Sequence, residues 1–360
     1  MKSNALLLVL LCLVLQSPAP AQEKPEEKKP TDPAAKRTLT DEEDKLLYEA
    51  EKQAKRADAL QAQGKYAEAE TELRALLVLC ERVLGAEHPN TLGSRNNLAN
   101  ALQAQGKYAE AEKEYRAVLA IRERVMGAEH PDTLKSRNNL AAVLATQGKY
   151  GEAAKEFRAV LVIQERILGA EHSATLQSRN NLALALDFQG KYGEAEKEHR
   201  AVLAIRERVL GGGHPDTLSS RNNLAKVLDA QGKHEEAEKE HRAVLAIRER
   251  VQGAEHPDTL SSRNNLAAVL AAQGKSGEAE KEHRVVLAIR ERVLGAKHPD
   301  VFRSCFNLAQ CLAAQKKFPE ALVFIQRAES GMRKTLGADH SDTKDAKRIR
   351  ERIEAAMKKE

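Results

Sequence analysis

The sequence repeats itself every 42 residues, and this period limits the possible fold more than any other feature. A histidine recurs at this spacing seven times: His88, His130, His172, His214, His256, His298 and His340. A glycine recurs at the same spacing six times: Gly64, Gly106, Gly148, Gly190, Gly232 and Gly274. A period of this length is typical of stacked supersecondary units, each of which buries its apolar face only against its neighbours.

Each unit is predicted to contain two antiparallel helices. In residues 130–171, Pro131 lies where a helix begins, because a proline at the first helical position loses no hydrogen bond. Apolar residues follow at helical spacing until Gly148, which can adopt the left-handed backbone of a tight reversal. A second helix is expected from about Tyr150 to Leu168. Two helices joined by so short a turn pack antiparallel.

These features predict an all-α protein, an α-solenoid built as a right-handed superhelix of helix pairs. Six units carry the glycine turn, and a seventh turn at residues 316–318 lacks the glycine. Seven helix pairs are therefore expected over residues 39–340. The polar segment 341–360 is predicted to form a capping helix, because a stack of this kind needs a polar end.

The recurring residues resemble a known repeat family. The middle units show Asn-Asn-Leu-Ala, a Gly-Lys-Tyr turn, a Glu-Ala pair and a Gly-Ala-Glu-His-Pro-Asp loop, in that order. This order resembles tetratricopeptide (TPR) repeats, in the 42-residue variant of kinesin light chains and related bacterial proteins. The resemblance covers roughly residues 40 to 345 and implies that the first helix of each pair lines a concave groove. Because the chain shows no sign of the coiled coil that joins kinesin light chains to their motor, a motor-transport role is not expected.

Residues 1–21 are predicted to be a signal peptide. Lys2 is positively charged, residues 5–15 are apolar, and residues 19–21 (Ala-Pro-Ala) have the small-x-small form of a cleavage site. The apolar run is short for a bilayer span, and an uncleaved membrane anchor is the alternative. Residues 22–38 combine prolines and charges without large apolar side chains, so we predict a disordered linker. We therefore expect an exported protein, periplasmic or secreted, from a bacterium.

The charge balance and the absence of catalytic motifs narrow the function. The chain carries 58 basic and 53 acidic residues, a formal net charge of +5, which provides no electrostatic footprint for nucleic acid and no polybasic membrane patch. It has no glycine-rich phosphate loop, no Gly-x-Ser-x-Gly elbow and no His-Glu-x-x-His motif. We therefore predict a protein that is not an enzyme, that needs no cofactor or metal, and whose partners are other proteins or peptides. A monomer is assumed.

Paired asparagines in the first helices are the candidate binding residues. An asparagine amide both donates and accepts hydrogen bonds, so it can bind the backbone of an extended peptide, a role that the family resemblance also implies. The second members of the pairs are the stronger candidates: Asn97, Asn139, Asn181, Asn223 and Asn265, with Asn307 at the same position of the seventh unit. The first members are Asn96, Asn138, Asn180, Asn222 and Asn264. The alternative is that these amides satisfy polar groups inside the protein.

Variable residues flank these asparagines, and the family geometry implies that they share the same face. Three of them are charged, namely Lys135, Lys226 and Arg303, at positions where other units have small or neutral side chains. Constant asparagines beside variable neighbours are the pattern of a groove that selects its partner. Drift at exposed sites would give the same pattern.

Arginines and histidines at other repeated positions have structural explanations. The ladder of Arg95, Arg137, Arg179, Arg221 and Arg263 is expected to pair with glutamates of adjacent helices. Arg-Glu-Arg runs in the second helices, such as residues 206–208, are expected on a solvated outer face. The loop histidines are too far apart to share a zinc ion. In the second helices, His199, His241 and His283 are expected to be partly buried and hydrogen-bonded rather than to sense pH.

The sequence thus predicts a protein–protein interaction scaffold that binds peptide or protein segments in the groove formed by the first helices. The alternative is a structural spacer or a self-assembling envelope element with no dedicated peptide ligand. The two predictions differ in whether the face of the first helices is available to a partner.

Overall fold

The structure is a computed structural model that describes residues 40–358, and every regular element in this range is an α-helix. The chain divides into two compact units, the second of which begins at Tyr192. The all-α solenoid prediction is confirmed for the described part of the chain. The predicted signal peptide (1–21) and linker (22–38) lie outside the described residues.

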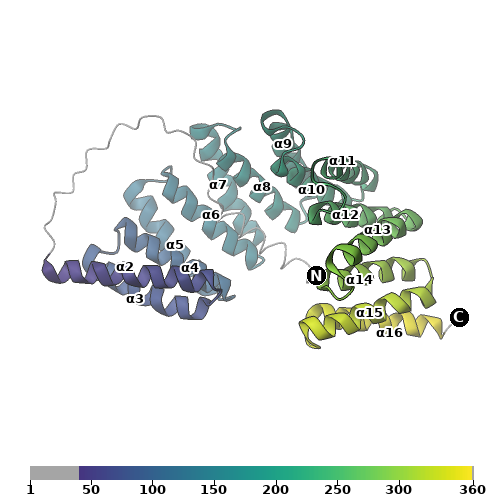
Figure 1. The fold of residues 1–360 in the computed structure, drawn as a ribbon. Helices are drawn as coiled ribbons and strands as arrows, with labels where there is room; N and C mark the ends of the chain where they lie inside the picture. Colours follow the sequence, from purple (N-terminus) through teal and green to yellow (C-terminus); the bar gives the residue numbers. More distant parts are fainter. Residues whose placement is uncertain (1–39, 359–360) are drawn as a thin grey trace. The chain divides into compact units, whose positions relative to one another are not determined.

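The described residues of unit 1 form seven helices, drawn from purple to teal in Figure 1. They are α2 (Asp41–Ala62), α3 (Tyr66–Leu84), α4 (Pro89–Ala104), α5 (Tyr108–Met126), α6 (Pro131–Thr146), α7 (Tyr150–Leu168) and α8 (Ser173–Phe188). Each helix packs against the next one in the chain, so the layers of the unit follow the order of the sequence.

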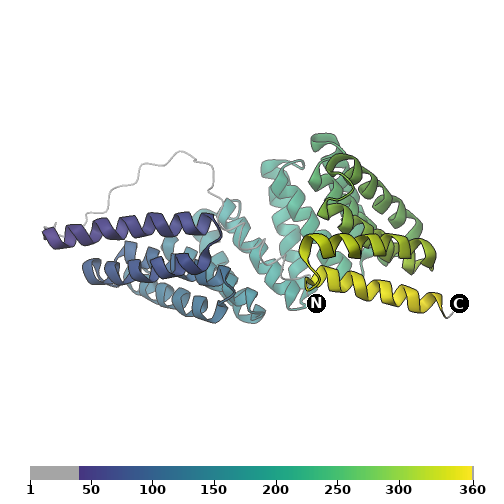
Figure 2. The same ribbon diagram turned by 60° about the horizontal axis from the view of Figure 1, so that its bottom comes forward.

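Unit 2 contains eight helices, which end in the yellow α16 of Figures 1 and 2. They are α9 (Tyr192–Leu210), α10 (Pro215–Ala230), α11 (His234–Gln252), α12 (Pro257–Ala272), α13 (Ser276–Leu294), α14 (Pro299–Ala314), α15 (Phe318–Leu336) and α16 (Ser341–Met357). Consecutive helices again pack against each other, and α16 covers α15 and touches α14. Below, the first and second helices of each pair are called A helices (α2, α4, α6, α8, α10, α12, α14) and B helices (α3, α5, α7, α9, α11, α13, α15).

The predicted helix ends are confirmed, because local residues fix them. Helix α6 ends at Thr146 and α7 begins at Tyr150, with Gly148 between them at a φ of 78°. In the seventh pair the turn has Lys316 instead of glycine, and this lysine adopts a φ of 60°. The same left-handed turn is therefore made without glycine, at the steric cost of a side chain in that conformation.

The loop histidines start the helices that follow them. In α6, Nδ1 of His130 accepts a hydrogen bond from the backbone N–H of Asp132 at 3.2 Å. The same contact is made by His88, His172, His214, His256, His298 and His340. The ring nitrogen satisfies one of the N–H groups that a helix start leaves unpaired, which explains the histidine ladder without a metal.

Leucine and alanine form the core between neighbouring helices. In α6, Leu140, Ala141 and Leu144 are buried, and in α7 so are Ala153 and Phe157. The alanines have no accessible surface, so helix backbones approach closely at these points while the leucines fill the space between layers. In α10 and α12 the buried positions lie on one side of each helix, so the opposite side remains as a surface.

Candidate functional site

Three consecutive A helices of unit 2 present equivalent residues on one face. Asn223, Asn265 and Asn307 are half-buried at the same position of α10, α12 and α14. The residues four before and three after them are exposed: Ser219 and Lys226, Ser261 and Ala268, Arg303 and Gln310. Residues at these spacings lie on one side of a helix, so each asparagine is placed between two exposed neighbours. We call this surface the A-helix face of unit 2.

The first asparagine of each pair points into the packing between helices. In α12, Oδ1 of Asn264 lies 3.2 Å from Nδ1 of the buried His283 on α13. The Oδ1 atoms of Asn138 and Asn222 are buried and have no hydrogen-bond partner, and Asn180 is also buried. These positions favour an internal structural role for the first asparagine.

In unit 1, several of the candidate amides bind each other. Asn139 on α6 donates from Nδ2 to Oδ1 of Asn96 on α4, at 2.9 Å. On α8, Gln177 donates to Oδ1 of Asn181, whose side chain is only 1% exposed. Asn97 is half-buried and Lys135 is exposed. The sequence does not show which asparagines are used in such internal contacts, because the same Asn-Asn pair occurs in both units.

The arginine ladder pairs with glutamates, as predicted. Arg221 on α10 binds Glu207 of the preceding B helix α9 and Glu240 of the following B helix α11. The equivalent contacts join Arg95 to Glu81 and Glu114, Arg137 to Glu123 and Glu156, and Arg263 to Glu249 and Glu282. Each of these guanidinium groups therefore links three consecutive helices and is occupied within the protein.

The prediction for the Arg-Glu-Arg runs was wrong for their first arginine. Arg206 is 8% exposed, and its Nη1 donates to the backbone carbonyl of Asp216 at 3.0 Å and to Oγ of Ser220 at 2.8 Å. Arg122 and Arg290 make the same two contacts with the helix that follows each of them. The long side chain reaches the start of the next A helix, where a carbonyl and a hydroxyl accept its hydrogen bonds. Only the last arginine of the run, Arg208, lies on the exposed surface.

The three histidines of the B helices are more deeply buried than expected. His199, His241 and His283 are 0%, 4% and 8% exposed, and burial lowers the pKa of each to about 4. His283 lies within hydrogen-bond distance of Asn264, whereas neither ring nitrogen of His199 has a partner. The rings are thus buried rather than partly buried, and the predicted hydrogen bond is present at His283 but absent at His199.

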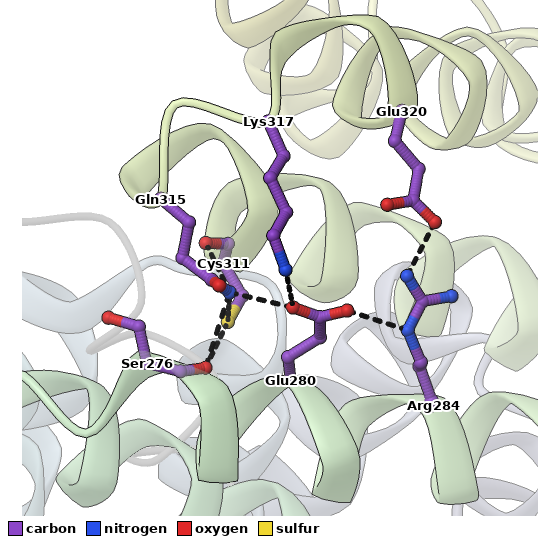
Figure 3. Close-up of polar contacts among 7 residues, drawn as sticks. All are labelled: Ser276, Glu280, Arg284, Cys311, Gln315, Lys317 and Glu320. Carbon is purple, nitrogen blue, oxygen red and sulfur yellow. Dashed lines mark hydrogen bonds and ion pairs between the residues drawn. The ribbon is translucent and has the colours of Figure 1, made fainter.

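A repeated polar cluster that the sequence analysis did not identify connects a B helix to the turn of the next helix pair, and Figure 3 shows one example. At its centre, the Glu280 carboxylate on α13 accepts hydrogen bonds from Nε2 of Gln315 at 3.0 Å and Nζ of Lys317 at 2.7 Å. On the other side it accepts from Nε of Arg284 at 2.8 Å. The Lys317 hydrogen bond in particular lowers the pKa of Glu280 to about 2. This group, which we call the carboxylate clamp, fixes α13 to the turn between α14 and α15.

The carboxylate clamp recurs at four other joints. Glu70, Glu112, Glu196 and Glu238 each bind the glutamine and lysine of a later turn in the same way. In α7 the equivalent residue is Ala154, so the series is broken there. The signal in the sequence was the glutamine that precedes every Gly-Lys turn, since an invariant polar residue beside a turn glycine indicates a specific hydrogen bond.

Residues 40–358 contain no group of three or more histidine, cysteine or acidic side chains arranged to hold a metal ion. Over the same residues, no helix combines the length and the apolar character needed to cross a membrane.

Comparison with known proteins agrees with the repeat architecture. A family model described as tetratricopeptide repeat matches residues 48–101, 93–161, 138–208, 188–249, 230–292 and 258–334. A solved structure described as a putative kinesin light chain with nearly identical TPR-like repeats, from Podosopora anserina, is 33% identical with a TM-score of 0.54. The match covers 57% of this chain and 98% of that chain. No curated protein matches the chain.

Two more distant structures share the fold. BtubC (BKLC) from P. vanneervenii is 24% identical with a TM-score of 0.52, and the match covers 66% of this chain and 93% of that chain. A tetratricopeptide repeat protein from Parabacteroides merdae is 17% identical with a TM-score of 0.58, and the match covers 84% of this chain and 98% of that one.

Proposed function

The chain belongs to the tetratricopeptide repeat family, and we propose that its A helices bind extended segments of other polypeptides. Repeats of this family are generally protein–protein interaction scaffolds and typically have no enzymatic activity. The proposal adds the place of binding, the A-helix face of unit 2, and the chemistry of the segment that binds there.

The observation that carries the proposal is the row of Asn223, Asn265 and Asn307. These amides stand at one position of three consecutive A helices, and the exposed residue three positions later differs on each helix, being Lys226, Ala268 and Gln310. Because each amide lies on a different A helix, the three would meet the backbone of a bound segment at successive points along it. The exposed neighbours would contact its side chains.

The charges on this face favour an acidic partner segment. Lys226 and Arg303 are exposed on the face, at the two outer A helices of the three. Arg303 has one weak contact, to Asp300 at 3.7 Å, and remains largely accessible. Arginine and lysine recognise carboxylates through charge-assisted hydrogen bonds.

Binding in the periplasm or outside the cell remains part of the proposal. It depends on the signal peptide predicted for residues 1–21, with a membrane anchor as the alternative. An exported scaffold would meet segments of other envelope or secreted proteins.

A structural spacer is the second candidate, and the internal amide contacts favour it. The bond between Asn139 and Asn96, and the contact between Asn264 and His283, show asparagines used for packing. Assembly end to end has less support. In α2, Arg56 is exposed at the position where later A helices have a core leucine. A charged side chain there opposes stacking of another helix.

A peptide selection tests the proposal. The full chain is used to select binders from a phage-displayed library of random 12-residue peptides, and affinities are measured by fluorescence anisotropy. We expect enrichment of acidic peptides. The combined substitution Asn223→Ala, Asn265→Ala and Asn307→Ala should weaken their binding by at least tenfold without changing the unfolding midpoint.

The matched control is Asn264→Ala, which removes the partner of His283 and leaves the A-helix face intact. It should lower stability and preserve affinity. A library that yields no binders, or binders that tolerate the triple substitution, would contradict the proposal and favour the spacer.

A further inference from the structure

We propose that the α11–α13 region of unit 2 is acid-labile and opens below about pH 6, where His241 and His283 begin to take up protons on opening. This property is separate from peptide binding and does not depend on it. It is built into the B helices, which lie behind the A-helix face.

The two histidines occupy a core position that also holds a buried histidine, His199, in α9, and that holds larger apolar or aromatic side chains in four other pairs. The same position of the repeat holds Leu73, Tyr115, Phe157 and Ile325, all of which are at most 1% exposed. His241 and His283 are 4% and 8% exposed in the same place. A charged imidazolium in such a site would lose its hydration without gaining an ion-pair partner, so the folded state excludes it.

The two carboxylates that act on the rings, Asp229 and Glu282, are already paired with His234 and Arg263. From α10, the charges that act on His241 are those of Lys226 and Asp229, which are opposite in sign, and the Asp229 carboxylate is already engaged with His234. The Nδ1 atom of His241 has no partner. His283 faces the Oδ1 atom of Asn264 from α12, and the charge that acts on it is Glu282 of its own helix.

The direction of the pH effect follows from these environments. Burial lowers the pKa of both rings to about 4, whereas an imidazole in an unfolded chain titrates near 6.5. The opened state therefore takes up protons first as the pH falls. The loss of stability begins below about pH 6.5 and is complete near pH 4. At pH 5 each imidazole should raise the opening constant by roughly thirtyfold.

The glutamates of the carboxylate clamps do not titrate in the pH range in which the two histidines do. The pKa values of Glu238 and Glu280 are about 2, so both groups stay charged between pH 6.5 and pH 4.5. Unit 1 supplies an internal control, because α5 and α7 carry Tyr115 and Phe157 at the histidine position while keeping the same arginine–glutamate ladder.

Hydrogen exchange measured by mass spectrometry at pH 7 and pH 5 tests the proposal in the full chain. After correction for intrinsic exchange rates, protection in α11 and α13 should fall at least tenfold at pH 5. Protection in α5 and α7 should change less than threefold. Equal losses in the two regions would overturn the proposal.

Two variants identify the groups responsible. His241→Phe combined with His283→Phe should abolish the acid-dependent loss in α11 and α13, and loss that persists would contradict the assignment. The reverse change, Phe157→His, should make α7 acid-labile in unit 1. If the double variant does not fold, the wild-type comparison and the Phe157→His variant still test the proposal. Each of these experiments can give a result that contradicts it.

Discussion

The joint between α13 and α14 and the last joint, between α15 and α16, are equivalent contacts built from different residues. In the interior joint, Arg290 donates to Ser304, and Leu287 and Leu308 are buried in the same apolar cluster. In the last joint, 42 residues later, the positions of Arg290 and Ser304 hold Met332 and Ala346, both buried. The positions of the two leucines hold Glu329 and Arg350, which form an ion pair at 2.7 Å.

Between the two joints, both residues of each contacting pair differ together. A polar pair has become apolar and an apolar pair has become ionic, and each contact stays matched in character. The physical reason is that one unmatched member of a buried polar pair costs far more than replacing both members. At these two joints the contacting residues differ, but each pair remains matched in character.

A matched exchange of size occurs inside the last pair. The interior pair α12–α13 has Leu260 and Ile289 where α14–α15 has Phe302 and Gly331. A Cβ atom added at Gly331 would lie 2.3 Å from the Phe302 ring, so the glycine provides the space that the larger ring occupies. This contact gives the largest expected effect of a single substitution.

Breaking the size match should destabilise the last pair most. Gly331→Ile should cost about 3 kcal/mol or more in the free energy of unfolding, because the added side chain overlaps the Phe302 ring. Urea denaturation followed by circular dichroism measures the change. Adding Phe302→Leu recreates the interior combination and should recover most of the loss. A double variant as unstable as Gly331→Ile would contradict the size match.

Breaking the polar match of the interior joint should have the next largest effect. Arg290→Ala removes the donor to Ser304 and to the carbonyl of Asp300, and should cost about 2–3 kcal/mol. Arg290→Met with Ser304→Ala copies the last joint and should cost less than about 1 kcal/mol by the same denaturation measurement. If the double variant is less stable than Arg290→Ala, the identity of these residues contributes more to the free energy of unfolding than the matching of the pair does.

The carboxylate clamp should contribute a smaller amount. Glu280→Ala copies Ala154 and should cost about 1–2 kcal/mol, whereas Ala154→Glu should stabilise unit 1 by about 0.5–1 kcal/mol. Because the pKa of Glu280 is about 2, below its ordinary value of 4.5, its contribution is present above pH 4.5 and disappears as the pH falls through 2. Denaturation at pH 7 and pH 2.5 measures both effects.

The control for the clamp is Glu278→Ala, since Glu278 is 53% exposed and pairs with Arg242 at the surface. Its cost should stay below about 0.5 kcal/mol at either pH. A loss equal to that of Glu280→Ala would show that the clamp is an ordinary surface ion pair.

The smallest effect is expected at a buried hydroxyl. The Oγ1 atom of Thr259 is buried without a partner, and the last pair has Val301 at this position. Thr259→Val should therefore stabilise the protein by about 0.5–1 kcal/mol. Thr217→Val is the matched control, because Thr217 donates to the carbonyl of Arg206 at 3.3 Å, and this change should be neutral or slightly destabilising. Equal gains would show that the hydrogen bond has no part in the difference.

Much of the fold could be predicted from the sequence because its signals are local. The ends of α6 and α7 follow from His130, Pro131 and Gly148, which act within a few residues of themselves. The arginine ladder was also predictable, since glutamates recur at matching positions of the neighbouring helices.

The roles of the asparagines were not predictable to the same degree, because they depend on which side chain a neighbouring helix supplies. Asn139 binds Asn96 in unit 1, whereas Asn264 faces His283 in unit 2. Arg206 was assigned to the surface because helical periodicity indicates direction but not how far a long side chain reaches. Aligning the units with each other would have revealed the paired exchanges, such as Arg290 and Ser304 becoming Met332 and Ala346.

Site-specific photo-crosslinking tests most directly whether a partner segment occupies the A-helix face of unit 2. A benzophenone amino acid is placed at Ser261 on α12 or, as the control, at the exposed Val285 on α13, and an acidic peptide from the library selection is added. We predict a crosslinked peptide from position 261 and none from position 285. Crosslinking from position 285 alone, or from neither position at a saturating peptide concentration, would contradict the account.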